Sequence, residues 1–154
     1  MPILVRSNKT LPELFDRVRE CNTNEEKIDV LTKYKSRQMR WFVNATYNFD
    51  FSDFKIPEYT PNPKNRPQEI CYLSLNKAVN RIESAINFHK LGNDKRYNDL
   101  MTIVLENVSY REAKLVEDLF TNKKIEGISK TVWKKMYPEF FRSQEEIQTT
   151  QIGN

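Results

Sequence analysis

The sequence predicts an all-α fold, a compact single-domain bundle of six or seven helices with one long proline-rich connection. Only three glycines occur in 154 residues, and apolar residues recur at three- and four-residue spacing, which favours helices joined by tight turns. No segment alternates convincingly between apolar and polar residues, as a strand would. A serine or threonine stands three residues before a glutamate at three places, the pattern of a helix capping box. These pairs are Thr10 with Glu13, Thr23 with Glu26, and Ser109 with Glu112.

Size and composition indicate one water-soluble domain over residues 1–141 and a polar, flexible C-terminal tail over 142–154. The chain is 38% apolar and 30% charged, enough to bury a core beneath a wet surface. The net charge is +4 and the sequence pI is near 9.0. Such a balance favours polyanions only if the positive charge gathers on one face.

The first third of the chain predicts three helices. The first begins at Leu11 and ends near Cys21, and the second follows Thr23 and is brief. The third covers about 36–47 and turns Met39, Phe42, Val43 and Thr46 inward. Trp41 lies off this apolar stripe, so its spacing permits either packing against a neighbour or partial exposure.

Residues 48–67 are predicted to be irregular, because they contain four prolines, Pro57, Pro61, Pro63 and Pro67. The aromatic residues of this segment are expected to anchor it over the core as a loop. They are Phe49, Phe51, Phe54 and Tyr59. A binding platform is the alternative reading of the same residues.

The rest of the chain predicts four more helices. Pro67 suits the first turn of a long helix with Ile70 and Leu73 on its core side, ending at a turn around Gly92. Further helices are expected over 94–107 and from 110 to about 121.

A basic turn precedes the last predicted helix, with five lysines and one glutamate between residues 123 and 135. Gly127 can take the positive φ that other residues resist. Ser129 is placed to cap a short helix that Pro138 ends. Its apolar side chains are Val132, Trp133 and Met136.

The sequence lacks the motifs of metal binding, nucleophilic catalysis, phosphate-loop binding and membrane insertion. Cys21 and Cys71 lack the neighbouring ligands of a metal site, and His89, the only histidine, follows no nucleophile motif. There is no glycine-rich phosphate loop, and no apolar run approaches the roughly 20 residues that span a bilayer. We therefore expect a protein of a reducing cytoplasm that is not an enzyme and that needs no cofactor, metal or membrane.

Two stretches carry a family resemblance. LTKYKSRQMRWFVNATYNFDFSDFKIP at 31–57 and EAKLVEDLFTNKKIEGISKTVWKKMYPEFF at 112–141 resemble the helical N-terminal DNA-binding domain of phage-type ATP-dependent DNA ligases. They also resemble a group of small tailed-phage proteins built on the same plan. Between these two stretches the chain resembles those proteins only in being helical.

The resemblance implies a module that grips the backbone of duplex DNA. The DNA-binding residues that it implies are Lys33, Lys35, Arg37 and Arg40 in the early stretch and Lys123, Lys124, Gly127, Ser129 and Lys130 in the late one. Lys134 on the same helix as Lys130 joins them. Amides at a helix start can hold a phosphate oxygen while lysines neutralise its neighbours. The alternative is that both basic runs are solvated helix ends.

The chain departs from the ligase family where catalysis begins. Lys124-Ile125-Glu126-Gly127 imitates the Lys-x-Asp-Gly of the adenylated lysine, but Glu126 replaces the aspartate and no later adenylation motif follows. The expected function is thus a non-catalytic phage accessory protein of the host cytoplasm that binds duplex DNA and serves a replication, repair or packaging protein. The alternative is a protein-binding module that acts on a host or virion protein.

Overall fold

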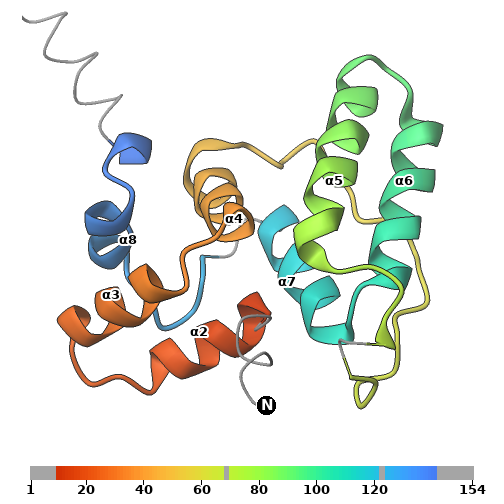
Figure 1. The fold of residues 1–154 in the computed structure, drawn as a ribbon. Coiled ribbons are helices and arrows are strands. Elements are labelled where there is room, and N and C mark those ends of the chain that lie inside the picture. The colour runs from red at the N-terminus through yellow and green to blue at the C-terminus, as the bar shows by residue number, and fades with distance from the viewer. Residues whose placement is uncertain (1–9, 68–69, 122–123, 142–154) are drawn as a thin grey trace, which may run out of the picture. The chain divides into compact units, whose positions relative to one another are not determined.

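The structure is a computed structural model that describes residues 10–67, 70–121 and 124–141. Within these ranges it contains seven α-helices and no strand (Figure 1). More than half of the chain lies in them, so the predicted all-α class is confirmed. The helices are α2 (Leu11–Arg19), α3 (Asn24–Lys33), α4 (Arg37–Asn48), α5 (Leu75–Lys90), α6 (Asp94–Asn107), α7 (Tyr110–Phe120) and α8 (Lys130–Met136).

Contacts between residues group the chain into two compact units. The first unit comprises Met1–Pro12 and Asp50–Lys124, and the second comprises Glu13–Phe49 and Ile125–Asn154. The second unit therefore joins stretches from the two ends of the chain. The single domain expected over 1–141 stays a prediction, and the expected tail at 142–154 lies outside the described residues.

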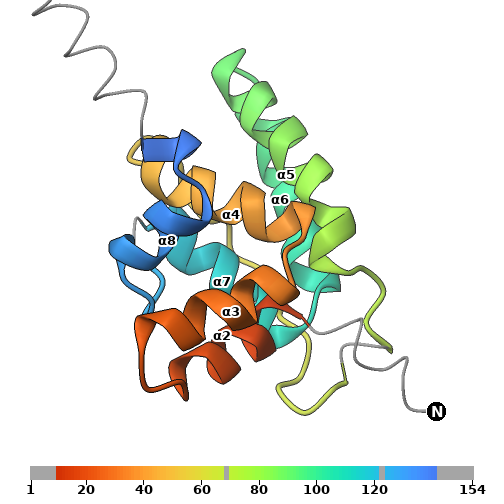
Figure 2. The ribbon, with the colours of Figure 1, turned by 60° about the vertical axis from the view of Figure 1, so that its left-hand side comes forward.

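The first unit is built around a hairpin of α5 and α6, which run side by side in both ribbon views (Figures 1 and 2). Gly92 makes the turn between them, as the sequence predicts, and has a φ of +84°. Asn93 then caps α6 by accepting a hydrogen bond from the amide of Arg96. The apolar side chains buried along the hairpin are Val79, Ile82, Ile86, Met101, Val104 and Leu105.

Glu112 in the first turn of α7 carries a carboxylate that is almost completely buried, with 1% of the residue exposed. It accepts hydrogen bonds from the amide and hydroxyl of Ser109, at 3.3 and 2.9 Å, which confirms the predicted capping box. It also accepts the amide of Leu75 at 3.2 Å. One buried side chain thus holds the first turns of both α5 and α7.

The predicted start of the fourth helix at Pro67 is wrong. α5 begins at Leu75, because the hydroxyl of Ser74 accepts from the amide of Lys77 and caps the helix there. Ile70, expected in the core, is 67% exposed. Leu73 is buried as expected, but it precedes the helix and donates its amide to Asn107 at 3.0 Å.

The segment from 50 to 67 contains no regular helix, in agreement with its prolines. Phe51 is buried against Phe120, with ring centroids 4.4 Å apart. The hydroxyl of Tyr97 donates to the carbonyl of Lys55 at 2.8 Å. Internal contacts of this kind support the predicted loop anchored by aromatics rather than the binding platform.

The second unit packs α3 against α8. Trp133 is completely buried and meets Phe15 edge to face, with centroids 6.1 Å apart, which confirms it as core. Thr23 and Glu26 form the predicted capping box of α3. Trp41, which spacing alone leaves undecided, is half-buried and lies edge to face with the neighbouring Phe42.

Removing the buried carboxylate of Glu112 should destabilise the protein far more than removing its exposed counterpart. Glu112→Ala leaves the buried amides of Leu75 and Ser109 without their acceptor, and we expect the free energy of unfolding to fall by about 3 kcal/mol. Glu26→Ala removes the matching carboxylate of the exposed box, which accepts from the amide of Thr23 at 3.1 Å, and should lower it by about 0.5–1 kcal/mol. Urea unfolding followed by circular dichroism measures both, and equal losses would contradict the assignment.

Candidate nucleic-acid interface

Charge is unevenly distributed along the second unit. Between residues 30 and 49 there are four cationic side chains and no acidic one, and between 127 and 138 there are three and none. Six acidic side chains of the unit lie over 13–29, and Glu126 and Glu139 flank the late stretch. The cations thus concentrate at the end of α3, the start of α4 and α8.

Direct contacts join the early and the late basic stretches. The ammonium of Lys35 lies 4.9 Å from the ring centroid of Tyr137, and the guanidinium of Arg40 lies 4.8 Å from that of Phe140. Arg40 also approaches the carboxylate of Glu139 at 3.4 Å. Residues about a hundred positions apart in sequence are therefore neighbours in one unit. We call the exposed cations of these stretches the basic surface, namely Lys33, Lys35, Arg37, Arg40, Lys130, Lys134 and Lys135.

Aromatic rings also lie beneath two other lysines of this surface. Lys33 lies 5.6 Å from the ring centroid of Tyr34, and Lys130 lies 5.7 Å from that of Phe141. The ring of Tyr34 is shared with Arg17, which donates to its hydroxyl at 3.1 Å. Such contacts hold the stems of the side chains while the charged heads stay in water.

Two further cations of the second unit are engaged in holding the turn before α8. Arg19 donates to the carbonyl of Glu126 at 2.8 Å, and Lys27 donates to the carbonyl of Gly127 at 2.9 Å. Gly127 has a φ of +79°, as the sequence predicts. No sequence signal reveals these bonds, because each joins residues at least 100 positions apart.

The predicted DNA-binding residues do not all fall on the basic surface. Lys124 ends the first unit and is exposed, and Lys123 lies outside the described residues. Gly127 and Ser129 belong to the second unit, but the hydroxyl of Ser129 makes no capping hydrogen bond and α8 is only seven residues long. Phosphate binding at the amides of this turn stays a prediction.

Tyr137 lies beneath the basic surface. It is buried, and its hydroxyl, like the indole nitrogen of Trp133, has no hydrogen-bond partner among the described residues. Burial raises the pKa of Tyr137 to about 12. Its ring therefore supports Lys35 as a neutral phenol at physiological pH.

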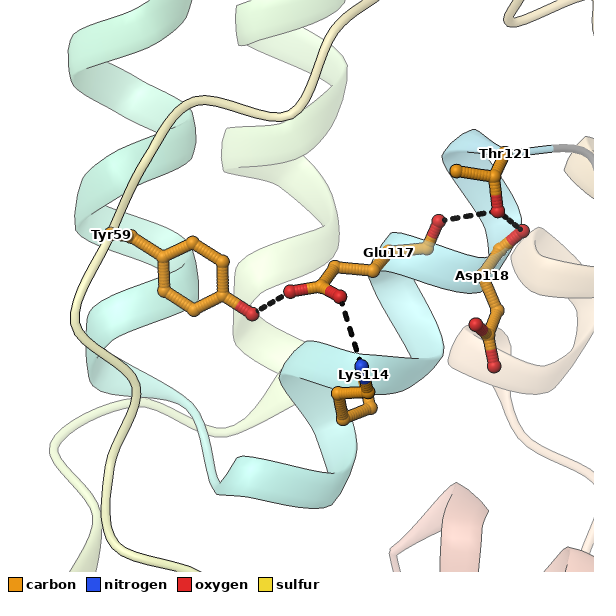
Figure 3. A network of polar contacts seen from close by, with 5 residues as sticks. All are labelled: Tyr59, Lys114, Glu117, Asp118 and Thr121. Atoms are coloured by element: carbon orange, nitrogen blue, oxygen red, sulfur yellow. Dashed lines mark hydrogen bonds and ion pairs between the residues drawn. The ribbon is translucent and has the colours of Figure 1, made fainter.

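A polar cluster in the first unit involves Tyr59, Lys114 and Glu117 (Figure 3). The hydroxyl of Tyr59 donates to the carboxylate of Glu117, and the ammonium of Lys114 donates to the same carboxylate at 3.2 Å. Burial, and then the bond to Glu117, raises the pKa of Tyr59. The bond to Glu117 likewise raises the pKa of Lys114. Since Tyr59 comes from the irregular segment and Glu117 from α7, the cluster fastens that segment to the helix.

His89 has an acidic partner that the sequence reading missed. Its Nδ1 lies 2.7 Å from a carboxylate oxygen of Asp94, across the Gly92 turn. Phe54 covers the ring at 4.3 Å between centroids. The sequence signal for this pair was an aspartate five residues after the histidine, with a glycine turn between them. The contact joins the end of α5 to the start of α6.

In the part of the chain that the structure describes, no three histidine, cysteine or acidic side chains lie close enough together to hold a metal ion. None of the described helices combines the length and the apolar character that crossing a membrane requires.

Comparison with known proteins identifies no related protein. No protein-family model, curated protein or solved structure matches the chain. The ligase-like resemblance consequently stays an expectation from the sequence.

Alkaline pH should weaken the fold partly through Tyr59. A phenol whose pKa is higher in the folded state than its usual value near 10 keeps its proton while the unfolded chain releases it, so stability is full below about pH 10 and falls above it. Tyr59→Phe should make this fall shallower by up to about 1.4 kcal/mol per pH unit. Urea unfolding between pH 9 and 11.5 measures the slope. Tyr72→Phe, at a residue that is 82% exposed, is the control and should leave it unchanged.

Alanine should be tolerated less well at Gly127 than at Gly92. Both residues have positive φ, which costs an L-residue about 1–2 kcal/mol. At Gly92 a new Cβ meets nothing within 4 Å, whereas at Gly127 it lies 2.6 Å from Cγ of Arg19. Moving Arg19 would break its bond to Glu126, so we expect Gly127→Ala to lower the free energy of unfolding by about 1 kcal/mol more than Gly92→Ala. Thermal unfolding of the two variants compares them, and equal melting temperatures would refute the close contact.

Proposed function

We propose that this chain is a non-catalytic accessory protein that binds duplex DNA through its backbone phosphates. The observation that carries the proposal is the basic surface, where cations from α3, α4 and α8 gather without an acidic residue in their own stretches. Phosphate contacts supply affinity without reading base sequence.

The side chains of the basic surface are suited to phosphate binding. Lys33, Lys35, Lys130 and Lys134 are exposed, and within the described residues none of them has an ion-pair partner. The rings beneath three of them restrict their motion, so less side-chain freedom is lost on binding. Arg40 and Glu139 are both about half exposed, and such a pair is worth at most about 1 kcal/mol, so a phosphate can replace the carboxylate.

The biological setting rests on the resemblance of 31–57 and 112–141 to the ligase DNA-binding domain and to small tailed-phage proteins. From it we infer a phage protein that acts in the host cytoplasm beside a replication, repair or packaging protein. The alternative is a module that binds a host or virion protein.

Salt dependence of DNA binding separates the two functions. We expect wild-type protein to bind a 20-base-pair duplex with an affinity that falls steeply between 50 and 200 mM NaCl, as counterion release requires. The triple variant Lys33→Ala, Lys130→Ala, Lys134→Ala should reduce the slope of log affinity against log salt by up to about 2.7. Fluorescence anisotropy measures both slopes.

A charge-matched control shows whether the effect is local. Lys55, Lys77 and Lys95 are exposed lysines of the first unit, and their triple alanine variant should keep nearly the wild-type slope. A second duplex of unrelated sequence should bind equally well. Failure of the wild type to bind at 50 mM NaCl, or equal losses in both variants, would exclude the basic surface and favour the protein-binding alternative.

A further inference from the structure

The α5–α6 hairpin carries a groove on the side away from its buried core. Its volume is about 310 Å³. It is lined from α5 by Asn80, Arg81, Ser84 and Phe88 and from α6 by Arg96, Leu100 and Ile103. These positions recur at three- and four-residue spacing, so each helix shows a second face in addition to the one that fills the core.

The floor of this groove is apolar and open to solvent. Phe88 and Leu100 are partly exposed, and Ile103 is 45% exposed. Leu91, which follows α5 and does not line the groove, is 81% exposed. Two of the four large apolar side chains that are exposed in the described part of the chain therefore belong to this hairpin. Exposed apolar surface with a polar border is typical of a protein-binding site.

The charge of the groove indicates the chemistry of its partner. Arg81 and Arg96 are its only charged lining residues, and among the described residues neither guanidinium forms an ion pair. Arg96 lies 5.7 Å from the ring centroid of Phe88, which holds it over the floor. Asp99, one turn along α6, is exposed and does not pair with Arg96. Two unpaired arginines beside an apolar floor complement a surface that is apolar with carboxylates at its edge.

We propose that this groove binds an amphipathic helix of another protein, with apolar side chains on the floor and glutamate or aspartate paired with Arg81 and Arg96. Two helices lying side by side present ridges between which a third helix packs. α5 has 16 residues and is about 24 Å long, so a partner helix of similar length would follow it. The site belongs to the first unit and shares no residue with the basic surface, so it does not depend on DNA binding.

The test uses a displayed library of random 16-residue peptides selected on the full-length protein. We expect enriched peptides to carry leucine, isoleucine, phenylalanine or methionine at three- and four-residue spacing, with acidic residues beside them. The most enriched sequence, synthesised and titrated by calorimetry, should bind the double variant Arg81→Glu, Arg96→Glu at least tenfold more weakly than the wild type. Ile103→Asp should also weaken binding of the peptide, because it places a charge on the apolar floor of the groove.

Matched variants make the outcome specific to the groove. Lys55→Glu with Lys95→Glu reverses as many charges in the same unit, at exposed positions that do not line the groove, and should leave binding unchanged. A peptide with lysine in place of its acidic residues should regain affinity for Arg81→Glu, Arg96→Glu. Circular dichroism checks that each variant folds.

Three results would overturn the proposal: no enrichment, enriched peptides without acidic residues, or equal affinity for the wild type and the arginine variant. The DNA-binding triple variant at Lys33, Lys130 and Lys134 should bind the peptide normally. Peptide binding that is lost in that variant would place the peptide on the basic surface and also count against the groove. Failure of either proposal can thus be recognised without the other.

Discussion

The carboxylate of Glu112 sets the geometry of the first unit. A buried carboxylate is costly unless donors surround it, and here the donors are the amide and hydroxyl of Ser109 and the amide of Leu75. Since these groups open α7 and α5, one side chain joins the starts of both helices, which Ser109 and Ser74 cap. The start of α5 at Leu75 in turn fixes which of its residues face the core and which form the groove.

The second unit uses its cations in two physically different ways. Arg19 and Lys27 donate to carbonyls of the turn before α8 and are therefore part of its structure. Lys35 and Arg40 lie on aromatic rings, which leave the charge accessible to a second partner. A charge count over the sequence treats these groups alike, although only the second kind remains available to phosphate.

The two proposed surfaces differ in chemistry as well as in position along the chain. The basic surface offers dispersed positive charge, which suits a polyanion and is weakened by salt. The groove combines an apolar floor with two arginines, a combination that suits a protein helix and depends less on salt. An accessory protein that brings DNA to a protein partner requires one surface of each kind.

The sequence by itself determined the all-α class, the capping boxes at Thr23 and Ser109, the turn at Gly92 and the positive φ of Gly127, because each follows from residues within a few positions of one another. Only the tertiary structure decided the contact of Lys35 with Tyr137 and the bond from Lys27 to Gly127, since their partners are about a hundred residues apart. The start of α5 at Leu75 rather than Pro67 combines a local cap at Ser74 with a buried carboxylate from another helix, Glu112, which accepts the first amide. Local spacing carries no information about a partner that folding brings from a distant part of the chain.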